Sequence, residues 1–544
     1  MKRGIFFRLL KDHSKGQALK IFAAAIASGF MQSLTILVVS FALDDIKAGD
    51  VSIRYFLLFL LSVGAYFVCY RYAVGHSTTV ALKVVSSLQM QLTNALKKLP
   101  LRNFEQLDEG QVYNEIIGNK DIIVEAARFV VMAVSGSSLM VVAFAFSLYL
   151  SVSGFLVILL TLVFGILFLS LVQVDVMRLQ QKAQSLDERF IRCLKDVIFG
   201  FTELKMNKAK QDELFEVEVV SRAAECTKIK QQSEQSLVRG LAFFSSFVFF
   251  PVAAIVFILP GFIELSFEDT VKLIGITLFS LGPLSSIVMA LPVLSKAEMM
   301  LINVKKFQET LEQMGETLSS DPVVPLDFQR LELRNCKFHY KSEDGLPQFS
   351  LDIDQFHLDK NEIVFLTGGN GSGKTSLMKV LAGLYPPDSG EITIDNRSID
   401  DVGLANYRSS FSMVLMNFHL FEKLYGVVPV DTAYCQELLK DMLLDDKISL
   451  VDGCRFSSTE VSSGQRKRLA VVAACLEKKD ILLFDEVAAD FDPIFRKFFY
   501  EEFIPKLRQS GKTILAISHD DRYYHIADRV VTMRYGEIDS TIKS

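Results

Sequence analysis

The chain has 544 residues, of which 50% are apolar and 22% are charged. A chain of this length exceeds what one hydrophobic core supports, so two or more domains are expected. The formal net charge of −5 excludes the strongly basic class that binds nucleic acid, and we expect no nucleic-acid partner.

Apolar segments dominate the first 300 residues. Charge-free stretches cover Ile21–Leu43, Tyr55–Tyr70, Phe129–Val174, Gly240–Ile263 and Leu273–Ser295. About 20 apolar residues cross a bilayer as a helix, and the third stretch is long enough for two crossings. The sequence therefore predicts six transmembrane helices, with membrane lipid as a partner.

The basic residues predict the orientation of these helices. Six of them precede the first stretch: Lys2, Arg3, Arg8, Lys11, Lys15 and Lys20. Basic segments stay in the cytoplasm, so the N-terminus is expected there, and an even number of crossings returns the C-terminus to the same side. The seven cysteines form no disulfide or metal-binding pattern, and we expect reduced thiols.

Two long polar insertions, His76–Arg128 and Asp175–Arg239, interrupt the apolar stretches. A helix rises about 1.5 Å per residue, so each insertion is long enough to extend the membrane helices into the cytoplasm and return. Their tips, expected near Asn119–Val124 and Gly200–Leu204, would then touch the domain that follows.

Three parts are expected along the chain. The transmembrane domain with its cytoplasmic helical extensions covers residues 1–310, and a charged linker with Pro322 and Pro325 covers 311–328. Strands alternate with helices over residues 329–544, as in an α/β nucleotide-binding domain. The expected fold is thus an α-helical membrane domain fused to an α/β P-loop domain.

The run GGNGSGKT fits the phosphate-binding pattern G-x-x-x-x-G-K-[ST], between the apolar strand Glu362–Leu366 and a predicted helix. Backbone N–H groups of such a loop hold phosphate, the lysine reaches the β- and γ-phosphates, and the hydroxyl that follows binds Mg²⁺. The residues expected to contact ATP are Gly368, Gly369, Asn370, Gly371, Ser372, Gly373, Lys374, Thr375 and Ser376.

The acidic partners of this loop follow later in the chain. Asp485 ends the apolar strand Ile481–Asp485, where it would hold Mg²⁺, and Glu486 would orient or deprotonate the attacking water. His519 follows the strand Thr513–Ser518 and fits a γ-phosphate sensor. The sequence therefore predicts Glu486, His519 and Lys374 as catalytic residues, with ATP and Mg²⁺ as cofactors.

With these motifs, the chain resembles an ABC transporter of the exporter type. Val461-Ser462-Ser463-Gly464-Gln465 resembles the L-S-G-G-Q signature, with Val461 and Ser463 as departures from it. The resemblance implies that Ser462, Ser463, Gly464 and Gln465 close over ATP held by a second copy of the chain. It also implies that Tyr340 stacks on adenine. Arg466-Lys467-Arg468 follows, where the family often has Gln between the arginines.

Several runs narrow the resemblance. DEVAADFDP (Asp485–Pro493), AISHDD (Ala516–Asp521), SSGQRKRLA (Ser462–Ala470) and the segment Phe199–Lys208 resemble bacterial exporters of cyclic peptides and peptide siderophores. Those proteins are half-transporters that work as homodimers in the inner membrane. The resemblance implies a homodimer with a small peptide or siderophore as substrate.

One position departs from the family pattern. Most exporters have a metal-binding Gln where this chain has Met416, and a thioether is a poor Mg²⁺ ligand. Either Asn417 replaces the Gln, or water does. We favour Asn417, which joins Thr375 and Asp485 as an expected metal ligand.

The sequence thus predicts an ATP-driven exporter of a small cyclic or siderophore-type peptide, which works by alternating access in the bacterial inner membrane. A flippase for lipids or lipid-linked glycans and a multidrug exporter remain alternatives. An ATP-gated regulatory protein is a third, which the complete set of catalytic residues disfavours.

Overall fold

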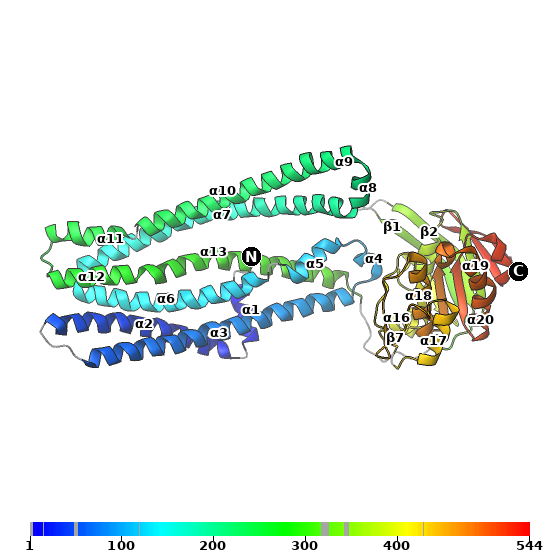
Figure 1. Ribbon diagram of the computed structural model, residues 1–544, viewed down its shortest axis with the longest axis horizontal. Coiled ribbons are helices and arrows are strands. Elements are labelled where there is room, and N and C mark those ends of the chain that lie inside the picture. The colour runs from blue at the N-terminus through cyan, green and yellow to red at the C-terminus, as the bar shows by residue number, and fades with distance from the viewer. Residues whose placement is uncertain are drawn as a thin grey trace. The chain divides into compact units, whose positions relative to one another are not determined.

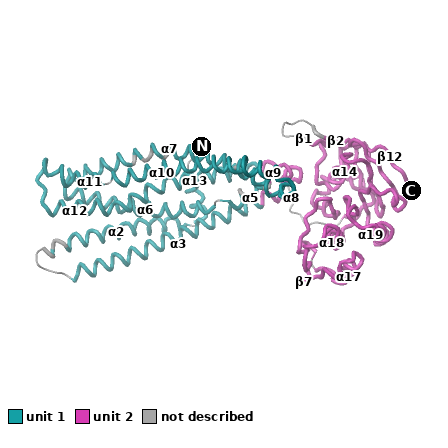
Figure 2. The backbone as a smooth tube through the Cα atoms, turned by 45° about the horizontal axis from the view of Figure 1, so that its top comes forward, with its two compact units in different colours: residues 1–93, 109–310 teal, residues 94–108, 311–544 magenta. Residues whose placement is uncertain are grey.

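The computed structural model describes residues 4–14, 16–47, 53–118, 120–247, 249–316, 326–341, 347–427 and 429–543. These form two compact units (Figure 2). The helical unit comprises Met1–Thr93 and Glu109–Thr310, and the α/β unit comprises Asn94–Asp108 and Leu311–Ser544. Residues 317–325 of the predicted linker lie outside the described part of the chain.

The helical unit consists of helices (Figure 1). Its elements are α1 (Ile5–His13), α2 (Gln17–Lys47), α3 (Ile53–Lys97), α5 (Glu109–Ile117), α6 (Asp121–Leu150), α7 (Val152–Phe199), α8 (Phe201–Met206), α9 (Lys208–Asp212), the π-helix η1 (Glu213–Val219), α10 (Val220–Phe247), α11 (Phe249–Ala253), the π-helix η2 (Ala254–Ile258), the 3₁₀ turn η3 (Leu259–Gly261), α12 (Phe267–Phe279) and α13 (Leu281–Met314).

Among the described residues, five helical segments are long and apolar enough to cross a membrane. They are Gln17–Ala42, Ile53–Lys97, Glu115–Leu150, Lys208–Gly261 and Phe267–Met314. The predicted fourth crossing corresponds to a shorter apolar part of α7, Val152–Gly165. The described residues thus contain five candidate spans, against the six predicted, and the fourth predicted crossing lies within α7.

Small residues let the helices of this unit approach closely. A Cβ atom added at Gly29 of α2 would lie 2.0 Å from the carbonyl oxygen of Ser135 on α6. The buried hydroxyls of Ser28 and Ser135 are hydrogen bonded at 2.8 Å. Such contacts stabilise helix pairs in lipid, where no hydrophobic effect drives their association. Helices α7 and α10 form a second antiparallel pair (Figure 1).

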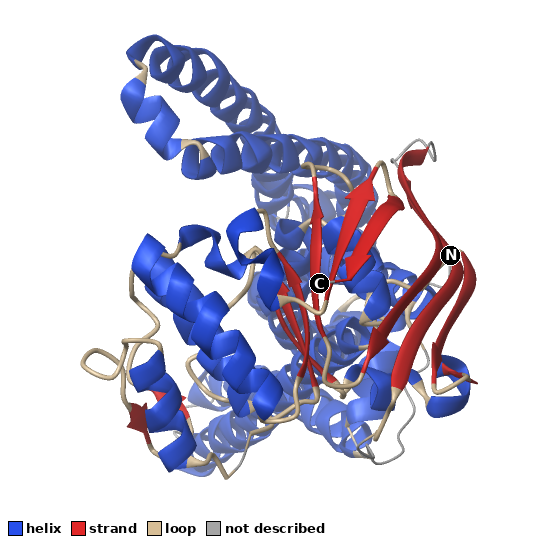
Figure 3. Ribbon diagram, turned by 90° about the vertical axis from the view of Figure 1, so that its right-hand side faces the viewer, coloured by secondary structure: helices blue, strands red, loops and turns tan. Residues whose placement is uncertain are grey.

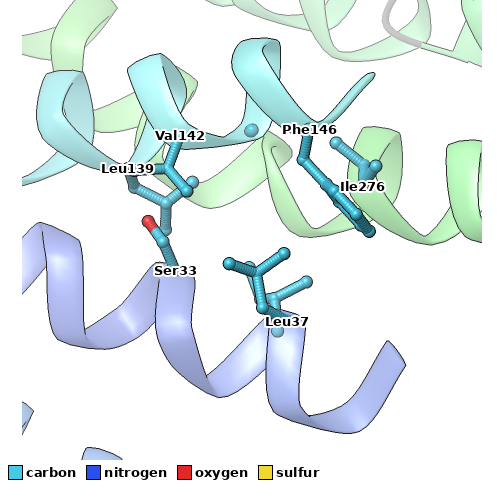
Figure 4. Close-up of a pocket in the computed structure, with 8 residues that line it drawn as sticks. Ser33, Leu37, Leu139, Val142, Phe146 and Ile276 are labelled. Atoms are coloured by element: carbon cyan, nitrogen blue, oxygen red, sulfur yellow. The ribbon is translucent and has the colours of Figure 1, made fainter. Parts of the chain in front are cut away.

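A small apolar cavity lies between α2, α6 and α12 (Figure 4). Its lining includes Ser33 and Leu37 from α2, Leu139 and Phe146 from α6, and Ile276 from α12. The volume of about 10 Å³ is that of one water at most. This part of the helical unit is therefore closely packed and has no room for a cargo.

In the α/β unit, helices surround two main sheets (Figure 3). The elements are α4 (Leu101–Phe104), β1 (Arg330–Lys341), β2 (Pro347–Asp359), β3 (Ile363–Gly368), α14 (Lys374–Leu381), β4 (Ser389–Ile394), β5 (Arg397–Ser398), α15 (Ile399–Val402), α16 (Leu404–Arg408), β6 (Phe411–Val414), α17 (Thr432–Asp441), β7 (Leu450–Val451), β8 (Arg455–Phe456), α18 (Ser463–Leu476), β9 (Ile481–Asp485), the 3₁₀ helix η4 (Val487–Asp490), α19 (Pro493–Phe498), the π-helix η5 (Phe499–Phe503), α20 (Ile504–Gln509), β10 (Thr513–Ile517), the 3₁₀ helix η6 (Asp521–Ile526), β11 (Arg529–Arg534) and β12 (Glu537–Lys543).

The central sheet has the strand order β12-β11-β3-β10-β9-β6, with β12 antiparallel to β11 and the other pairs parallel. Strands β9 and β10 are buried along their whole length, which explains why both appear as unbroken apolar runs. The smaller sheet β2-β1-β4-β5 is antiparallel. Since the carboxyl ends of parallel strands meet at one edge, β3, β9 and β10 bring the predicted site residues together there.

The end of α3 belongs to the α/β unit, and α4 follows it. Arg102 of α4 donates to the carbonyl oxygen of His339 at 2.7 Å and to Asp388 at 3.1 Å. Glu105 accepts from Lys379 at 2.8 Å and from the hydroxyl of Tyr385. This short helix is therefore fixed to the α/β unit by several charged hydrogen bonds.

The predicted position of the first tip, Asn119–Val124, is wrong. The chain leaves α3 at Lys97 and reverses around α4, whereas Asp121–Val124 begin α6 and Asn119 lies outside the described residues. Pro100 explains the early reversal, because proline lacks a backbone N–H group and disfavours helix in the residue before it. The second insertion turns at Gly200, between α7 and α8, within its predicted range.

Candidate nucleotide site

The phosphate-binding loop joins β3 to α14. Gly368, Gly371 and Gly373 all have positive φ, of 138°, 76° and 101°. A Cβ atom at Gly368 would lie 2.2 Å from the carbonyl oxygen of Met533, so no other residue fits there without a shift of the backbone. The loop lies at the N-terminus of α14, where unpaired N–H groups and the helix dipole favour an anion.

Two polar side chains in this loop are buried without a negative partner. The Ser372 hydroxyl has no hydrogen-bond partner in the described part of the chain. The Lys374 ammonium, in a residue that is only 6% exposed, donates to the carbonyl oxygens of Gly368 and Gly369 at 2.9 and 3.0 Å. Burial lowers the pKa of the Lys374 ammonium, although Glu486 and Asp485 oppose the shift. A phosphate group would supply the missing charge and acceptors, so the loop fits ATP.

Thr375 and Asp485 meet across α14 and β9. The Thr375 hydroxyl donates to both carboxylate oxygens of Asp485, at 3.2 and 3.1 Å. Burial raises the pKa of the Asp485 carboxyl, although hydrogen bonds from the Met416 amide and from Thr375 oppose the shift. No cluster of three or more His, Cys, Asp or Glu side chains occurs among the described residues. One carboxylate and one hydroxyl nevertheless fit Mg²⁺, which takes few protein ligands when phosphate oxygens and water complete its shell.

Glu486 and His519 lie side by side at the ends of β9 and β10. The His519 Nε2 atom lies 2.9 Å from Glu486 Oε1. Glu486 has left-handed backbone angles, φ 48° and ψ 36°, which cost about 1–2 kcal/mol for a residue other than glycine. This conformation ends β9 abruptly, and strain of this kind is concentrated at functional sites.

Lys467 of α18 supports this strained turn. Its ammonium lies 2.8 Å from Asp490 Oδ2 and donates to the carbonyl oxygen of Glu486 at 3.4 Å. The residue is only 7% exposed, so these two acceptors are in a partly desolvated setting. Lys467 stands where the family often has Gln, and its position in the sequence predicts no role for it. The contact depends on how α18 packs against η4, which the local sequence does not reveal.

Tyr340, expected to stack on adenine, ends β1 beside other aromatic rings. Its ring centroid lies 5.0 Å from that of Phe338 and 5.8 Å from that of Tyr385. The Ser376 hydroxyl donates to the Tyr340 hydroxyl at 3.4 Å, which places Ser376 between the aromatic cluster and the phosphate loop. Burial and the hydrogen bond to Glu105 raise the pKa of the Tyr385 hydroxyl well above its usual range.

The signature segment begins α18. The Ser462 side chain accepts from the Gln465 amide, and the Gln465 side chain accepts from the Ser462 amide, so the two form a capping box. Ser462 and Ser463 are exposed, and Gly464 and Gln465 are half-buried. Among the described residues, no hydrogen bond or ion pair joins this segment to the phosphate loop of the same chain. The two serines at the start of α18 are therefore accessible on the surface of the unit.

Asn417, the expected third metal ligand, has no bond to Asp485 among the described contacts, whereas Thr375 does. The Met416 amide donates to Asp485 Oδ2 at 3.4 Å, and its side chain is 57% exposed. The Asn417 side chain is exposed and has no hydrogen bond within the described ranges. The backbone at Met416 thus lies beside the expected metal carboxylate, and Asn417 is adjacent in sequence.

Comparisons with known proteins match both units. Residues 18–283 match the family described as the ABC transporter transmembrane region, and residues 351–489 match the family described as ABC transporter. The chain is 29% identical to the ATP-binding protein SyrD of Pseudomonas syringae pv. syringae, over 85% of this chain and 84% of that protein. It is also 29% identical to a multidrug resistance ABC transporter ATP-binding and permease protein of Lactococcus lactis, over 44% of this chain and 41% of that protein.

A solved structure, that of a bacterial Atm1-family ABC exporter with ATP bound, has the same fold. It superposes with a TM-score of 0.77 over 97% of this chain and 96% of the other, at 19% sequence identity. The phosphate loop, the acidic pair at the end of β9 and the apolar helices thus occur together in a fold known for exporters. The chain is a multi-pass membrane protein with an ATPase unit coupled to transport, and it belongs to the ABC transporter family.

Proposed function

We propose that two copies of this chain form an exporter that moves a small peptide, of cyclic or siderophore type, across the bacterial inner membrane. The observation that carries the homodimer is the exposed signature at the start of α18, which has no bond to the phosphate loop of its own chain. A second copy would place its signature over the first copy's Lys374 and Thr375, which gives two shared ATP sites. The basic segment before α2 supports a cytoplasmic N-terminus.

The residues of the site have distinct roles in this proposal. Lys374 binds the β- and γ-phosphates of ATP, and Thr375 and Asp485 hold Mg²⁺, which neutralises phosphate charge when it is bound. Glu486 orients the attacking water and accepts its proton, and the 2.9 Å contact with His519 fixes the orientation of that carboxylate. We assign Asn417 as the third metal ligand because its amide offers the oxygen that Met416 lacks.

Helix α4 supports coupling between the ATP site and the membrane helices. Glu105 binds Lys379 and Tyr385, and the Tyr385 ring contacts that of Tyr340, the proposed adenine-stacking residue. A nucleotide that moves Tyr340 therefore acts on Tyr385, which is hydrogen bonded to Glu105 at the end of α4. Differential contacts of this kind are what allow ATP to shift a two-state equilibrium between inward and outward forms.

The peptide cargo is supported by the resemblance of Asp485–Pro493, Ala516–Asp521, Ser462–Ala470 and Phe199–Lys208 to exporters of cyclic peptides and peptide siderophores. Export of lipids, lipid-linked glycans or unrelated drugs would use the same ATPase. Those cargoes remain alternatives. Measuring lipid flipping and peptide uptake with the reconstituted protein would distinguish them.

Disulfide cross-linking tests the shared ATP site. Cysteines introduced at the exposed positions Asn370 and Ser463 should form a covalent dimer on oxidation in the presence of ATP. Cys69 and Cys454 are half-buried and would be replaced by serine, whereas the other five cysteines are buried and can remain. Chains with either new cysteine alone serve as controls. A disulfide formed within one chain, or no disulfide in any nucleotide state, would reject the shared site.

A further inference from the structure

A larger cavity lies in the helical unit, separate from the small apolar one of Figure 4, and charged side chains contribute to its lining. It has a volume of about 900 Å³ and is lined by α5, α6, α7, α10 and α13. This volume is within the range of small-molecule sites, which is about 300–1,000 Å³. Most of the lining residues follow or precede the apolar stretches, so the predicted topology places the cavity toward the cytoplasmic side of the membrane.

The charge of the lining is negative. Five carboxylates line the cavity against two lysines, Lys230 and Lys296. Asp187 accepts from Lys230 at 2.8 Å and from the Cys226 thiol at 2.9 Å, so these groups satisfy one another. Glu115 is close enough to Lys120, outside the lining, for the two charges to interact.

Three further carboxylates remain: Asp121 and Glu125 on α6 and Glu234 on α10. Within the described ranges, no hydrogen bond or ion pair between side chains neutralises any of the three. Lys296 is the one cation of the lining that remains to balance them. The cavity therefore carries a net negative charge that the protein leaves in place.

An unpartnered hydroxyl marks the same cavity. Ser233 lines it on α10, next to Glu234, and is 3% exposed. Its Oγ atom has no hydrogen-bond partner in the described structure, although a helical serine commonly donates to the carbonyl oxygen four residues earlier. A buried polar group without a partner is costly unless a ligand or water satisfies it.

We infer that this negatively charged cavity binds a positively charged cargo. The exported peptide then carries at least one ammonium or guanidinium group. This inference rests on the proposed peptide export and adds the charge class of the substrate. Asp121, Glu125 and Glu234 attract the cationic group, and the Ser233 hydroxyl accepts a hydrogen bond from it. A concave site lined by one sign of charge concentrates ligands of the opposite sign, because its low-dielectric walls focus the field.

Fluorescence of a probe peptide tests the inference directly. The protein has no tryptophan, so a tryptophan in the peptide reports binding without background. Three cyclic hexapeptides are compared on the full-length protein in lipid nanodiscs: each has one tryptophan, and they carry two lysines, two acetylated lysines or two glutamates. The lysine peptide should bind about tenfold or more tightly than the acetylated one, and added salt should reduce this advantage.

The triple variant Asp121→Asn, Glu125→Gln, Glu234→Gln should lose the preference for the lysine peptide. Glu225→Gln is the matched control, because Glu225 is an exposed carboxylate of α10 outside the lining. Thermal unfolding of both variants checks that they are folded. If the triple variant does not fold, the three single variants, each expected to weaken the preference by a few-fold, carry the same test.

Equal affinity for the lysine and acetylated peptides would overturn the inference, and so would a preference that survives in the triple variant. The second result is also expected if the partner subunit, rather than cargo, occupies the cavity. Neither result contradicts peptide export itself. Conversely, charge-selective binding without ATP-driven uptake of any of the three peptides would reject the proposed export and leave the charge selectivity of the cavity in place.

Discussion

Replacing Lys467 should slow ATP hydrolysis without weakening ATP binding. The Lys467 ammonium contacts the Asp490 carboxylate at 2.8 Å and the Glu486 carbonyl oxygen at 3.4 Å. It thus holds the turn that keeps Glu486 in its left-handed conformation. Lys467 has no hydrogen bond or ion pair with the phosphate loop in the described structure, so it is a positioning residue.

The size of the effect follows from these contacts. A hydrogen bond from a charged donor stabilises by about 1.5–3 kcal/mol, and the 3.4 Å bond to Glu486 belongs at the lower end of that range. The Asp490 side chain is 47% exposed, so its ion pair adds no more than about 1 kcal/mol. If Lys467→Met removes about 1–2 kcal/mol of support from the active conformation of Glu486, kcat falls about five- to thirtyfold.

The assay is steady-state ATP hydrolysis by the full-length protein in nanodiscs, with nucleotide affinity measured separately. Lys467→Met should lower kcat and leave KM and nucleotide affinity within about twofold, whereas Lys467→Gln keeps a hydrogen-bond donor and should recover part of the rate. Lys506→Met is the control, because it removes a lysine that pairs with Glu437 and Asp441 at 2.7 Å on the surface of the same unit. An unchanged kcat, or a fall in kcat matched by an equal loss of nucleotide binding, would refute the positioning role.

Other substitutions at the site should separate the remaining roles. Glu486→Gln should keep ATP binding and nearly abolish phosphate release, because only the proton acceptor is lost. Lys374→Ala should weaken nucleotide binding itself, as measured by equilibrium titration. Asn417→Ala should impair Mg²⁺-dependent hydrolysis while Met416→Ala matters little, and equal tolerance across a Mg²⁺ titration would favour water as the ligand. Asp485→Asn should raise the unfolding temperature of the nucleotide-free protein at pH 7.5. Burial raises the pKa of the Asp485 carboxyl, so the fold loses stability as the pH rises through that pKa and the carboxyl ionises. The gain in unfolding temperature should therefore shrink at lower pH.

Local motifs made much of the α/β unit predictable. The phosphate loop needs glycine at fixed spacing between a strand and a helix, and the structure places Gly368–Gly373 between β3 and α14. The unbroken apolar run Ile481–Asp485 predicts a buried strand, and it forms β9. In both cases the local sequence alone requires the conformation.

Contacts between distant segments could not be predicted in this way. Lys467 reaches Asp490 because α18 packs beside η4, and the spacing of these residues carries no such information. The charged side chains of the large cavity likewise come from five helices, α5, α6, α7, α10 and α13. The reversal at Pro100 has a local cause, because proline is a helix-ending signal within the sequence itself.

ATP-driven peptide uptake into inside-out proteoliposomes tests the central claim most directly. The full-length protein is reconstituted, and the tryptophan-labelled lysine hexapeptide is followed into the lumen with ATP, with ADP, and with the Glu486→Gln variant. We expect accumulation against a concentration gradient with ATP and the wild-type protein alone. Hydrolysis of ATP without accumulation of any peptide, together with ATP-dependent flipping of a labelled lipid, would contradict the account.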